Sequence, residues 1–293
     1  MLEHVTRRRV SLPSGIEIAL LDWGGSGPPL LMHHANGFCA AIWDATARAL
    51  RDEFRVIAMD ARGHGDSSKP APPQPYEWVH FGEDVAAVAR SLAAELGVPR
   101  LRAGVGNSFG GTALLLASQL AAGEALFEEL ILVDPVLPPP NGASGPVGRG
   151  NTLSEAALKR RAHWPSREEA RAWFAGKTLF QKWEAHALDL YVTEGLRDDA
   201  DGVALKCPPK VESAIFSRSF ETDVGAALAA VETPTLFARA GQGYFPEEAF
   251  RAAAGRMPEG ALVTLDAGHL APMEASARVA RLVREVLAQR STG

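Results

Sequence analysis

The chain has 293 residues, 46% of them hydrophobic and 22% charged, with a formal net charge of −5 at pH 7. This composition is typical of a globular protein with a sizeable core, and the acidic balance argues against nucleic acid or an anionic membrane as a partner. No stretch reaches the roughly 20 apolar residues of a membrane-spanning helix, and the first residues lack the apolar run of a secretory signal. Cys39 and Cys207 lie far apart, which favours free thiols and a cytoplasmic protein over a disulfide framework.

Up to residue 134, short apolar runs alternate with helical patterns. Two β-rich runs, 5–12 and 16–23, flank Pro13-Ser14-Gly15 and predict an N-terminal hairpin. The alternation that follows is typical of a parallel sheet with helices on both faces. The expected strands are residues 30–34, 54–60, 101–105 and 130–134, and the expected helices are residues 40–50, 76–96 and 112–122.

The alternation stops after residue 134 and resumes at residue 235. Residues 135–150 are rich in proline and glycine and predict an exposed connector. Beyond it the patterns are helical, Ser166 and Glu169 fit a capping box, and no buried strand is evident, so we expect an all-helical insertion. We expect its helices at 153–162, 166–175, 179–196, 211–220 and 224–230, followed by strands at 235–239 and 261–265 and helices at 246–255 and from 271 onwards.

The pentapeptide Gly106-Asn-Ser-Phe-Gly110 fits the pattern G-x-S-x-G between an expected strand and an expected helix. This is the context of a nucleophile elbow, a tight turn that presents a serine hydroxyl, here that of Ser108, at the edge of a sheet and at the positive end of a helix. One competing interpretation is a chance match. Another is a dinucleotide-binding turn, G-x-G-x-x-G, but its third glycine is replaced by Phe109.

Four motifs lie in one order over nearly the whole chain, at residues 30–38, 60–67, 106–110 and 267–269. They resemble, in that order, the H-G-x-P oxyanion loop, the D-x-R-G-x-G-x-S turn, the nucleophile elbow and the histidine loop of the α/β-hydrolase family. The resemblance implies an α/β-hydrolase fold, with a mostly parallel central sheet, helices on both faces and an inserted all-helical cap. The expected domains are a core of residues 1–135 and 232–293 and a cap of residues 136–231.

The resemblance also implies a catalytic triad with Ser108 as nucleophile and His269 as its base. The family usually places the acid just after the strand expected at 235–239, where this chain has no carboxylate before Glu247. Asp134, at the end of the preceding strand, is the predicted substitute and keeps the order Ser, Asp, His. The alternatives are that Asp134 only forms an Asp-Pro turn and that Glu247 or, less favoured, Asp266 supplies the acid.

An oxyanion hole needs backbone N–H groups, and the resemblance assigns them to Phe109 and Asn36. His33 and His34 are expected to support the oxyanion loop, and His64 to order the glycine turn through hydrogen bonds. Aromatic residues of the insertion are candidates to line a substrate pocket. The residues assigned to substrate binding are Phe38, Trp164 and Trp183, and the wider set of candidates adds Trp173, Phe174, Phe180, Tyr191 and Phe216.

The predicted function is that of a serine hydrolase that cleaves a small to medium, largely apolar carboxylic ester through an acyl-enzyme. A lactone, an amide or a carbon–carbon bond could be cleaved by the same triad, and a non-catalytic ligand-binding protein is the alternative of another class. No cluster has metal-ligand spacing, so neither a metal nor another cofactor is expected. The expected partner is a small-molecule substrate, with no nucleic acid and no membrane, and the expected state is a monomer or homodimer.

Overall fold

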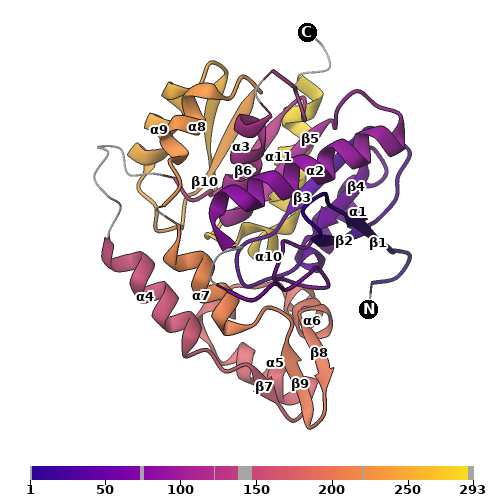
Figure 1. Ribbon diagram of the computed structural model, residues 1–293, viewed down its shortest axis with the longest axis vertical. Helices are drawn as coiled ribbons and strands as arrows, with labels where there is room; N and C mark the ends of the chain where they lie inside the picture. The colour runs from indigo at the N-terminus through magenta and orange to yellow at the C-terminus, as the bar shows by residue number, and fades with distance from the viewer. Residues whose placement is uncertain (1, 73–75, 122, 138–146, 220, 290–293) are drawn as a thin grey trace.

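The computed structural model describes residues 2–72, 76–121, 123–137, 147–219 and 221–289, and much of the predicted connector, residues 138–146, lies outside them. Eight strands of the described residues form one sheet, in the order β1-β2-β4-β3-β5-β6-β10-β11 (Figure 1). β1 and β2 form the predicted antiparallel hairpin, β2 is antiparallel to β4, and the remaining neighbours are parallel. The mostly parallel sheet is therefore confirmed. Its strands are β1 (Thr6–Ser11), β2 (Glu17–Asp22), β3 (Pro29–His33), β4 (Arg55–Met59), β5 (Ala103–Asn107), β6 (Leu130–Val133), β10 (Thr235–Ala240) and β11 (Gly260–Leu265).

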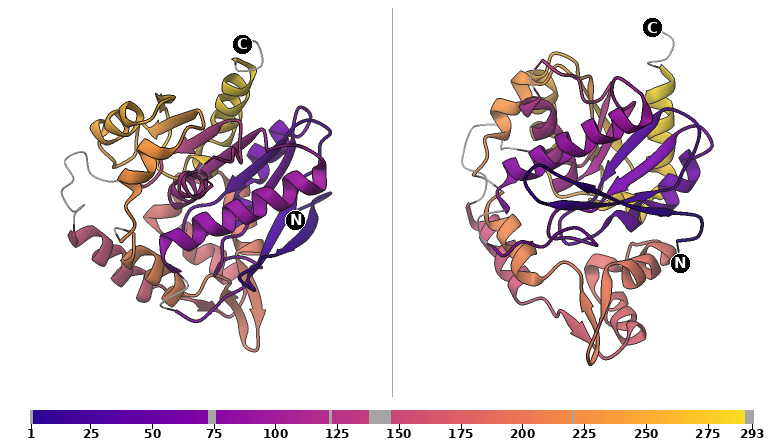
Figure 2. Two further views of the ribbon diagram at one scale, coloured as in Figure 1. Left: turned by 45° about the horizontal axis from the view of Figure 1, so that its top comes forward. Right: turned by 45° about the vertical axis from the view of Figure 1, so that its right-hand side comes forward.

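Helices cover both faces of this sheet (Figures 1 and 2). On one face α1 packs against α11, and on the other α2, α3, α8 and α9 form a continuous layer. α8 falls within the range predicted for the cap but packs against α3 and α9, and the division into two domains remains a prediction. The bounds are α1 (Asp44–Leu50), preceded by the 3-10 helix η1 (Ala40–Trp43), α2 (Trp78–Leu96), α3 (Phe109–Leu120), α8 (Val224–Ala230), α9 (Glu247–Arg256), α10 (Ala271–Glu274) and α11 (Ser276–Gln289).

The central strands are apolar on both faces because each face packs on a helical layer. In β3, Leu30 and Met32 belong to the core on the α1 and α11 side, whereas Leu31 belongs to the core on the α2 and α3 side. Successive side chains of a strand point to opposite faces of a sheet, so a strand covered on both faces becomes a continuous apolar run. This explains why the strands of the central sheet could be found from short apolar runs.

The segment from α4 to α7 corrects the prediction of an all-helical insertion. Besides its helices it contains a three-stranded antiparallel sheet in the order β7-β9-β8. The prediction was wrong because these strands are short, and in β8 the residues Arg197, Asp198 and Asp199 are charged and exposed, so no apolar run marks the strand. The elements are α4 (Val147–Leu158), β7 (His163–Trp164), α5 (Arg167–Ala175), the 3-10 helix η3 (Thr178–Phe180), α6 (Ala185–Glu194), β8 (Leu196–Asp199), β9 (Gly202–Leu205) and α7 (Pro209–Ser217).

The α4–α7 segment lies together on one side of the sheet, below it in Figure 1. α4 begins inside the predicted connector, and the helix predicted at 179–196 is divided into η3 and α6. The predicted cap of α5 is present in part, because the Ser166 hydroxyl oxygen accepts a hydrogen bond of 3.1 Å from the backbone N–H of Glu169. Within the described residues, no helix combines the length and apolar character needed to cross a membrane.

Candidate active site

A tight turn between β5 and α3 carries Ser108. Its backbone has φ 55° and ψ −123°, a conformation that non-glycine residues rarely adopt and that occurs mainly at functional sites. Close backbone contacts require the flanking glycines: a Cβ atom on Gly106 would lie 2.6 Å from the carbonyl oxygen of Gly110, and one on Gly110 would lie 2.5 Å from that of His33. The strand, turn and helix expected around the serine are therefore present.

The side chains of Ser108, His269 and Asp134 form a chain of hydrogen bonds. His269 Nε2 lies 2.9 Å from Ser108 Oγ, and His269 Nδ1 lies 2.6 Å from Asp134 Oδ2. The other carboxylate oxygen of Asp134 accepts a hydrogen bond of 2.9 Å from the backbone N–H of Ala240, and the side chain is buried. A carboxylate at Nδ1 holds the imidazole proton there, which leaves Nε2 free to accept the serine proton.

The two other acids considered from the sequence are engaged elsewhere. Glu247 forms an ion pair with Arg251, one turn further along α9. Asp266 forms an ion pair of 2.6 Å with Arg278, and its side chain is largely exposed. Among the described residues, the carboxylate bonded to His269 is that of Asp134.

Asn107 is a positioning residue that the sequence analysis missed. Its side-chain amide donates hydrogen bonds of 2.9 Å to the carbonyl oxygens of Val133 and His269. Val133 directly precedes Asp134, and Asn107 directly precedes Ser108. One buried amide therefore connects the three segments that carry the hydrogen-bonded side chains. No sequence signal marked it, because the second position of G-x-S-x-G accepts any residue.

Two backbone N–H groups near the Ser108 hydroxyl have no acceptor within the described part of the chain, those of Asn36 and Phe109. Asn36 lines the same cavity as Ser108, and Phe109 begins α3, where helical geometry leaves the first N–H groups without partners. The side-chain amide of Asn36 donates instead to the carbonyl oxygen of Glu212, at 3.1 Å. It therefore shapes the loop rather than the catalytic centre.

Two buried histidines hold the loop of residues 34–38. The backbone N–H of Ala61 donates to His34 Nε2 at 3.0 Å, and the His34 Nδ1 lies 2.8 Å from the carbonyl oxygen of Ala35. The backbone N–H of Gly37 donates to His64 Nε2 at 3.0 Å. His64 Nδ1 lies 3.1 Å from the carbonyl oxygen of Arg62, so in both rings Nδ1 faces an acceptor and carries the proton, and Nε2 accepts from a backbone N–H. Burial lowers the pKa of His34 to about 4 and that of His64 well below its ordinary value.

The buried histidines predict acid sensitivity. Burial lowers the pKa of His33 to about 3 as well, whereas an unfolded histidine titrates near 6.5. Below that pH the unfolded chain binds more protons than the folded one, so stability is present above pH ~6.5 and is lost as the pH falls towards the folded pKa values. For each such histidine we expect the free energy of unfolding to fall by about 1.4 kcal/mol per pH unit.

Urea unfolding at a series of pH values between neutrality and pH ~5 measures this slope. Replacement of the exposed His4 with Gln is the matched control, and we expect it to leave the slope unchanged. A free energy of unfolding that is flat over this range would contradict the assignment of neutral, buried rings.

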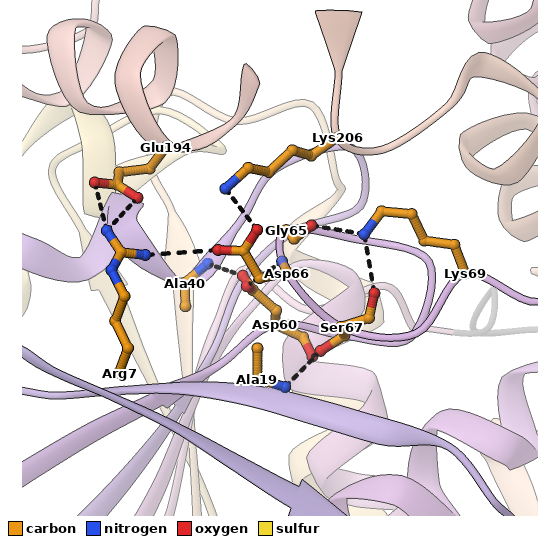
Figure 3. A network of polar contacts seen from close by, with 10 residues as sticks. All are labelled: Arg7, Ala19, Ala40, Asp60, Gly65, Asp66, Ser67, Lys69, Glu194 and Lys206. Atoms are coloured by element: carbon orange, nitrogen blue, oxygen red, sulfur yellow. Dashed lines mark hydrogen bonds and ion pairs between the residues drawn. The ribbon is translucent and has the colours of Figure 1, made fainter. Parts of the chain in front are cut away.

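A polar network anchors the α4–α7 segment to the sheet (Figure 3). The buried Asp60, directly after β4, accepts hydrogen bonds from the backbone N–H groups of Ala40 and Asp66, at 2.7 and 2.8 Å. The carboxylate of Asp66 pairs with Lys206 at 2.7 Å and lies 3.5 Å from Arg7 of β1. Arg7 pairs in turn with Glu194 of α6, at 2.7 Å. The turn that begins at Asp60 thus links the core to the segment that lies over Ser108.

A cavity of about 380 Å³ opens onto Ser108 and His269. Phe38, one of the residues assigned to substrate binding, lines it, but Trp164 and Trp183 do not. Trp164 is buried within the segment, with its ring 5.0 Å from that of Phe174. Trp183 packs behind Phe38, with the ring centres 5.2 Å apart. The aromatic residues of the α4–α7 segment that line the cavity are Trp173, Phe180 and Phe216, all from the wider set of candidates.

The cavity also contains an ion pair that the sequence did not indicate. Arg160 Nη1 lies 2.7 Å from the Glu212 carboxylate, and Arg160 Nη2 donates to the Tyr191 hydroxyl at 2.5 Å. The Tyr191 hydroxyl donates to the carbonyl oxygen of Gly37 at 3.1 Å. The pair is neutral as a whole, and it connects the α4–α7 segment to the loop of residues 34–38. Within the described residues, no group of three or more His, Cys, Asp or Glu side chains could hold a metal ion.

This geometry can be compared with known proteins. The profile of the alpha/beta hydrolase family matches residues 30–282, from β3 into α11. The chain belongs to the alpha/beta hydrolase family. The four motifs thus identified the family correctly.

Curated relatives match this hydrolase over limited stretches. The "Bifunctional esterase/perhydrolase DCH" of Acinetobacter calcoaceticus is 35% identical over 104 residues, which are 35% of each chain. The "Probable oxidoreductase EphD" of Mycobacterium tuberculosis is 34% identical over 87 residues, which are 29% of this chain and 15% of the relative. The matches therefore span 35% or less of these relatives' own length.

Solved structures match the hydrolase over nearly its full length. E-2-(acetamidomethylene)succinate hydrolase has a TM-score of 0.81 at 21% identity, over 96% of this chain and 98% of that one. A thermophilic esterase from Thermogutta terrifontis has a TM-score of 0.71 at 24% identity, over 97% and 98% of the two chains. At these identities the likeness supports the fold alone.

Proposed function

We propose that this hydrolase is a serine esterase with Ser108 as nucleophile, His269 as general base and Asp134 as the acid that orients the histidine. The observation that carries the proposal is the hydrogen-bonded chain of 2.9 and 2.6 Å from Ser108 through His269 to Asp134, at the floor of a cavity. A neutral serine hydroxyl is a poor nucleophile and needs such a base within hydrogen-bond reach.

The reaction proceeds in two steps. In the first, Ser108 Oγ bonds to the ester carbonyl carbon while its proton passes to His269 Nε2, and the alcohol then leaves with that proton, so that an acyl ester remains on the serine. In the second, a water molecule gives its proton to His269 and attacks the acyl carbon, which releases the acid and restores the serine. Asp134 remains ionised and stabilises the imidazolium in both steps.

The backbone N–H groups of Asn36 and Phe109 form the oxyanion hole in this proposal, since both lack an acceptor in the described part of the chain. Each donor of this kind is typically worth about 3 kcal/mol of transition-state stabilisation. His34 and His64 act through the loop that carries Asn36, because their neutral rings hold that loop in place.

The proposed substrate is a largely apolar carboxylic ester, with the α4–α7 segment as a cap over it. The aromatic lining and the self-neutralising pair of Arg160 and Glu212 support an apolar ligand. The esterase activity in the name of the Acinetobacter relative supports an ester. Cleavage of a lactone, an amide or a carbon–carbon bond is the alternative, because these reactions use the same catalytic residues.

Hydrolysis of p-nitrophenyl esters and labelling with a fluorophosphonate test this proposal together. We expect turnover, and we expect mass spectrometry to find the label on Ser108. Labelling without turnover of any ester would keep the serine hydrolase and move the substrate to another bond type. If the protein neither turns over nor reacts with the label, it is a non-catalytic ligand-binding member of the family.

A further inference from the structure

The exposed apolar residues of the described chain are not evenly spread. Three of them, Leu153, Leu179 and Tyr244, line the cavity of Ser108 and are 50%, 53% and 62% exposed. Single exposed apolar side chains are normal on a protein surface, but a group of them around one opening marks a binding surface. The exposed large apolar residues are Leu120, Leu153, Leu158, Leu179, Tyr244 and Val263.

The three residues reach the opening from segments far apart in the sequence. Leu153 lies on α4, Leu179 on η3, and Tyr244 in the loop between β10 and α9. The Tyr244 ring centre lies 4.7 Å from that of His269, so this apolar rim begins beside the proposed base. Leu179, Tyr244 and His269 also line a second hollow of about 160 Å³. This hollow is mixed, because Lys182, Gln242 and Glu274 line it as well, so the exposed apolar rim is that of the cavity itself.

The charged side chains that line the cavity of Ser108 are few, and each has a partner. The guanidinium of Arg160 is paired with Glu212 inside the cavity. The ammonium of Lys177, at the mouth, lies 4.3 Å from the centre of the Trp173 ring, which is a favourable site for a cation without an acid partner. The exposed rim of this cavity is therefore apolar at Leu153, Leu179 and Tyr244.

We propose that the hydrolase acts on esters with a long, unbranched alkyl chain. The ester group reacts at Ser108, the near part of the chain fills the cavity, and the far part leaves over Leu153, Leu179 and Tyr244. This proposal rests on the proposed esterase function and names its substrate class. Complete burial of one methylene group of the substrate raises its affinity by up to about fourfold. On a rim that leaves the chain half exposed, we expect each methylene to raise the affinity by about twofold.

The test compares p-nitrophenyl acetate, butyrate, octanoate, laurate and palmitate, each kept below its critical micelle concentration. For the wild type we expect kcat/KM to keep rising beyond octanoate. In Leu153→Ser and in Leu179→Ser we expect the kcat/KM for laurate, divided by the kcat/KM for acetate, to fall about tenfold. The reason is that several methylenes of the laurate chain lose their apolar contact. Leu120→Ser is the matched control: Leu120 is 46% exposed on α3 and does not line the cavity, so its ratio should not change.

Four results would overturn the proposal. A maximum at butyrate, or equal losses on acetate and laurate in both variants, would mean that the rim does not hold the chain. A preference for p-nitrophenyl hemisuccinate over butyrate that is lost in Lys177→Ala would assign the mouth to an anionic group. If kcat/KM does not rise with chain length below the critical micelle concentration, but does rise in a second series measured above it, the rim would be assigned to a lipid surface.

These failures differ from a failure of the esterase function. If one of these four results is found while short esters are hydrolysed and Ser108 takes the fluorophosphonate, the catalytic proposal stands and the long-chain proposal alone is wrong. If no ester is hydrolysed and the label does not react, both are wrong.

Discussion

Ser108→Ala is expected to lower kcat for ester hydrolysis by about 10⁶-fold and to leave the fold unchanged. The substitution removes one hydroxyl, which lies 2.9 Å from His269 Nε2, and no other atom can take its place in the covalent step. Alanine keeps a Cβ atom, so the strained backbone at φ 55° is no harder to form than with serine. The variant would still accelerate hydrolysis about 10³-fold over the uncatalysed reaction in water, through the oxyanion hole and substrate binding alone.

Ser118→Ala is the matched control for that measurement. Ser118 lies on the same helix, α3, and is also buried, but its hydroxyl has no hydrogen-bond partner in the described structure. We expect wild-type kcat in this variant. Circular dichroism of both variants checks the fold, and the kcat ratio is read from purified protein. If Ser108→Ala kept more than a small fraction of the activity, Ser108 would not be the nucleophile.

Much of the fold could be predicted from the sequence because the central strands are covered on both faces. Runs such as Leu130 to Val133 are apolar throughout and are bounded by turns, so each could be recognised alone. The serine turn could be recognised because backbone contact requires glycine at positions 106 and 110, and that requirement is visible in one pentapeptide. These features depend on local sequence.

The features that could not be predicted depend on contacts between distant segments. In the small sheet of the α4–α7 segment, β8 has exposed charged residues and β7 has only two residues, so neither strand has a signature of its own. The rings of Trp164 and Trp173 have centres 5.5 Å apart, yet Trp173 lines the cavity and Trp164 is fully buried, a difference that only the fold determines. The ion pair of Arg160 and Glu212 joins residues 52 positions apart.

The position of the proposed triad acid could be predicted from the sequence only in part. The absence of a carboxylate after β10 was visible in the sequence and led to Asp134, but its contact with His269 required the fold. Asp134 has φ 46°, a strained value for a residue with a side chain, and this turn aims its carboxylate towards His269. Both Ser108 and Asp134 thus follow parallel strands in the left-handed half of backbone space, where each strand ends at the cavity.

Asp134→Asn is expected to lower kcat by about 10⁴-fold, because an amide cannot make both hydrogen bonds of the carboxylate. Asp134 accepts one hydrogen bond from His269 Nδ1 and another from the N–H of Ala240. If the amide nitrogen faces His269, Nδ1 must accept, so the proton moves to Nε2 and the imidazole can no longer take the proton of Ser108. If it faces Ala240, two donors meet in a buried site, which is also unfavourable.

Glu247→Gln and Asp266→Asn are the matched controls, since each replaces a carboxylate by an amide near the same loops. Both side chains pair with arginines outside the hydrogen-bonded chain, so we expect kcat to change little. The fluorophosphonate reaction rate should follow the same order as kcat, because it too needs a deprotonated Ser108. A loss of less than about tenfold in Asp134→Asn, with a larger loss in Glu247→Gln, would move the acid to Glu247 and would mean that the 2.6 Å contact only fixes the turn after β6.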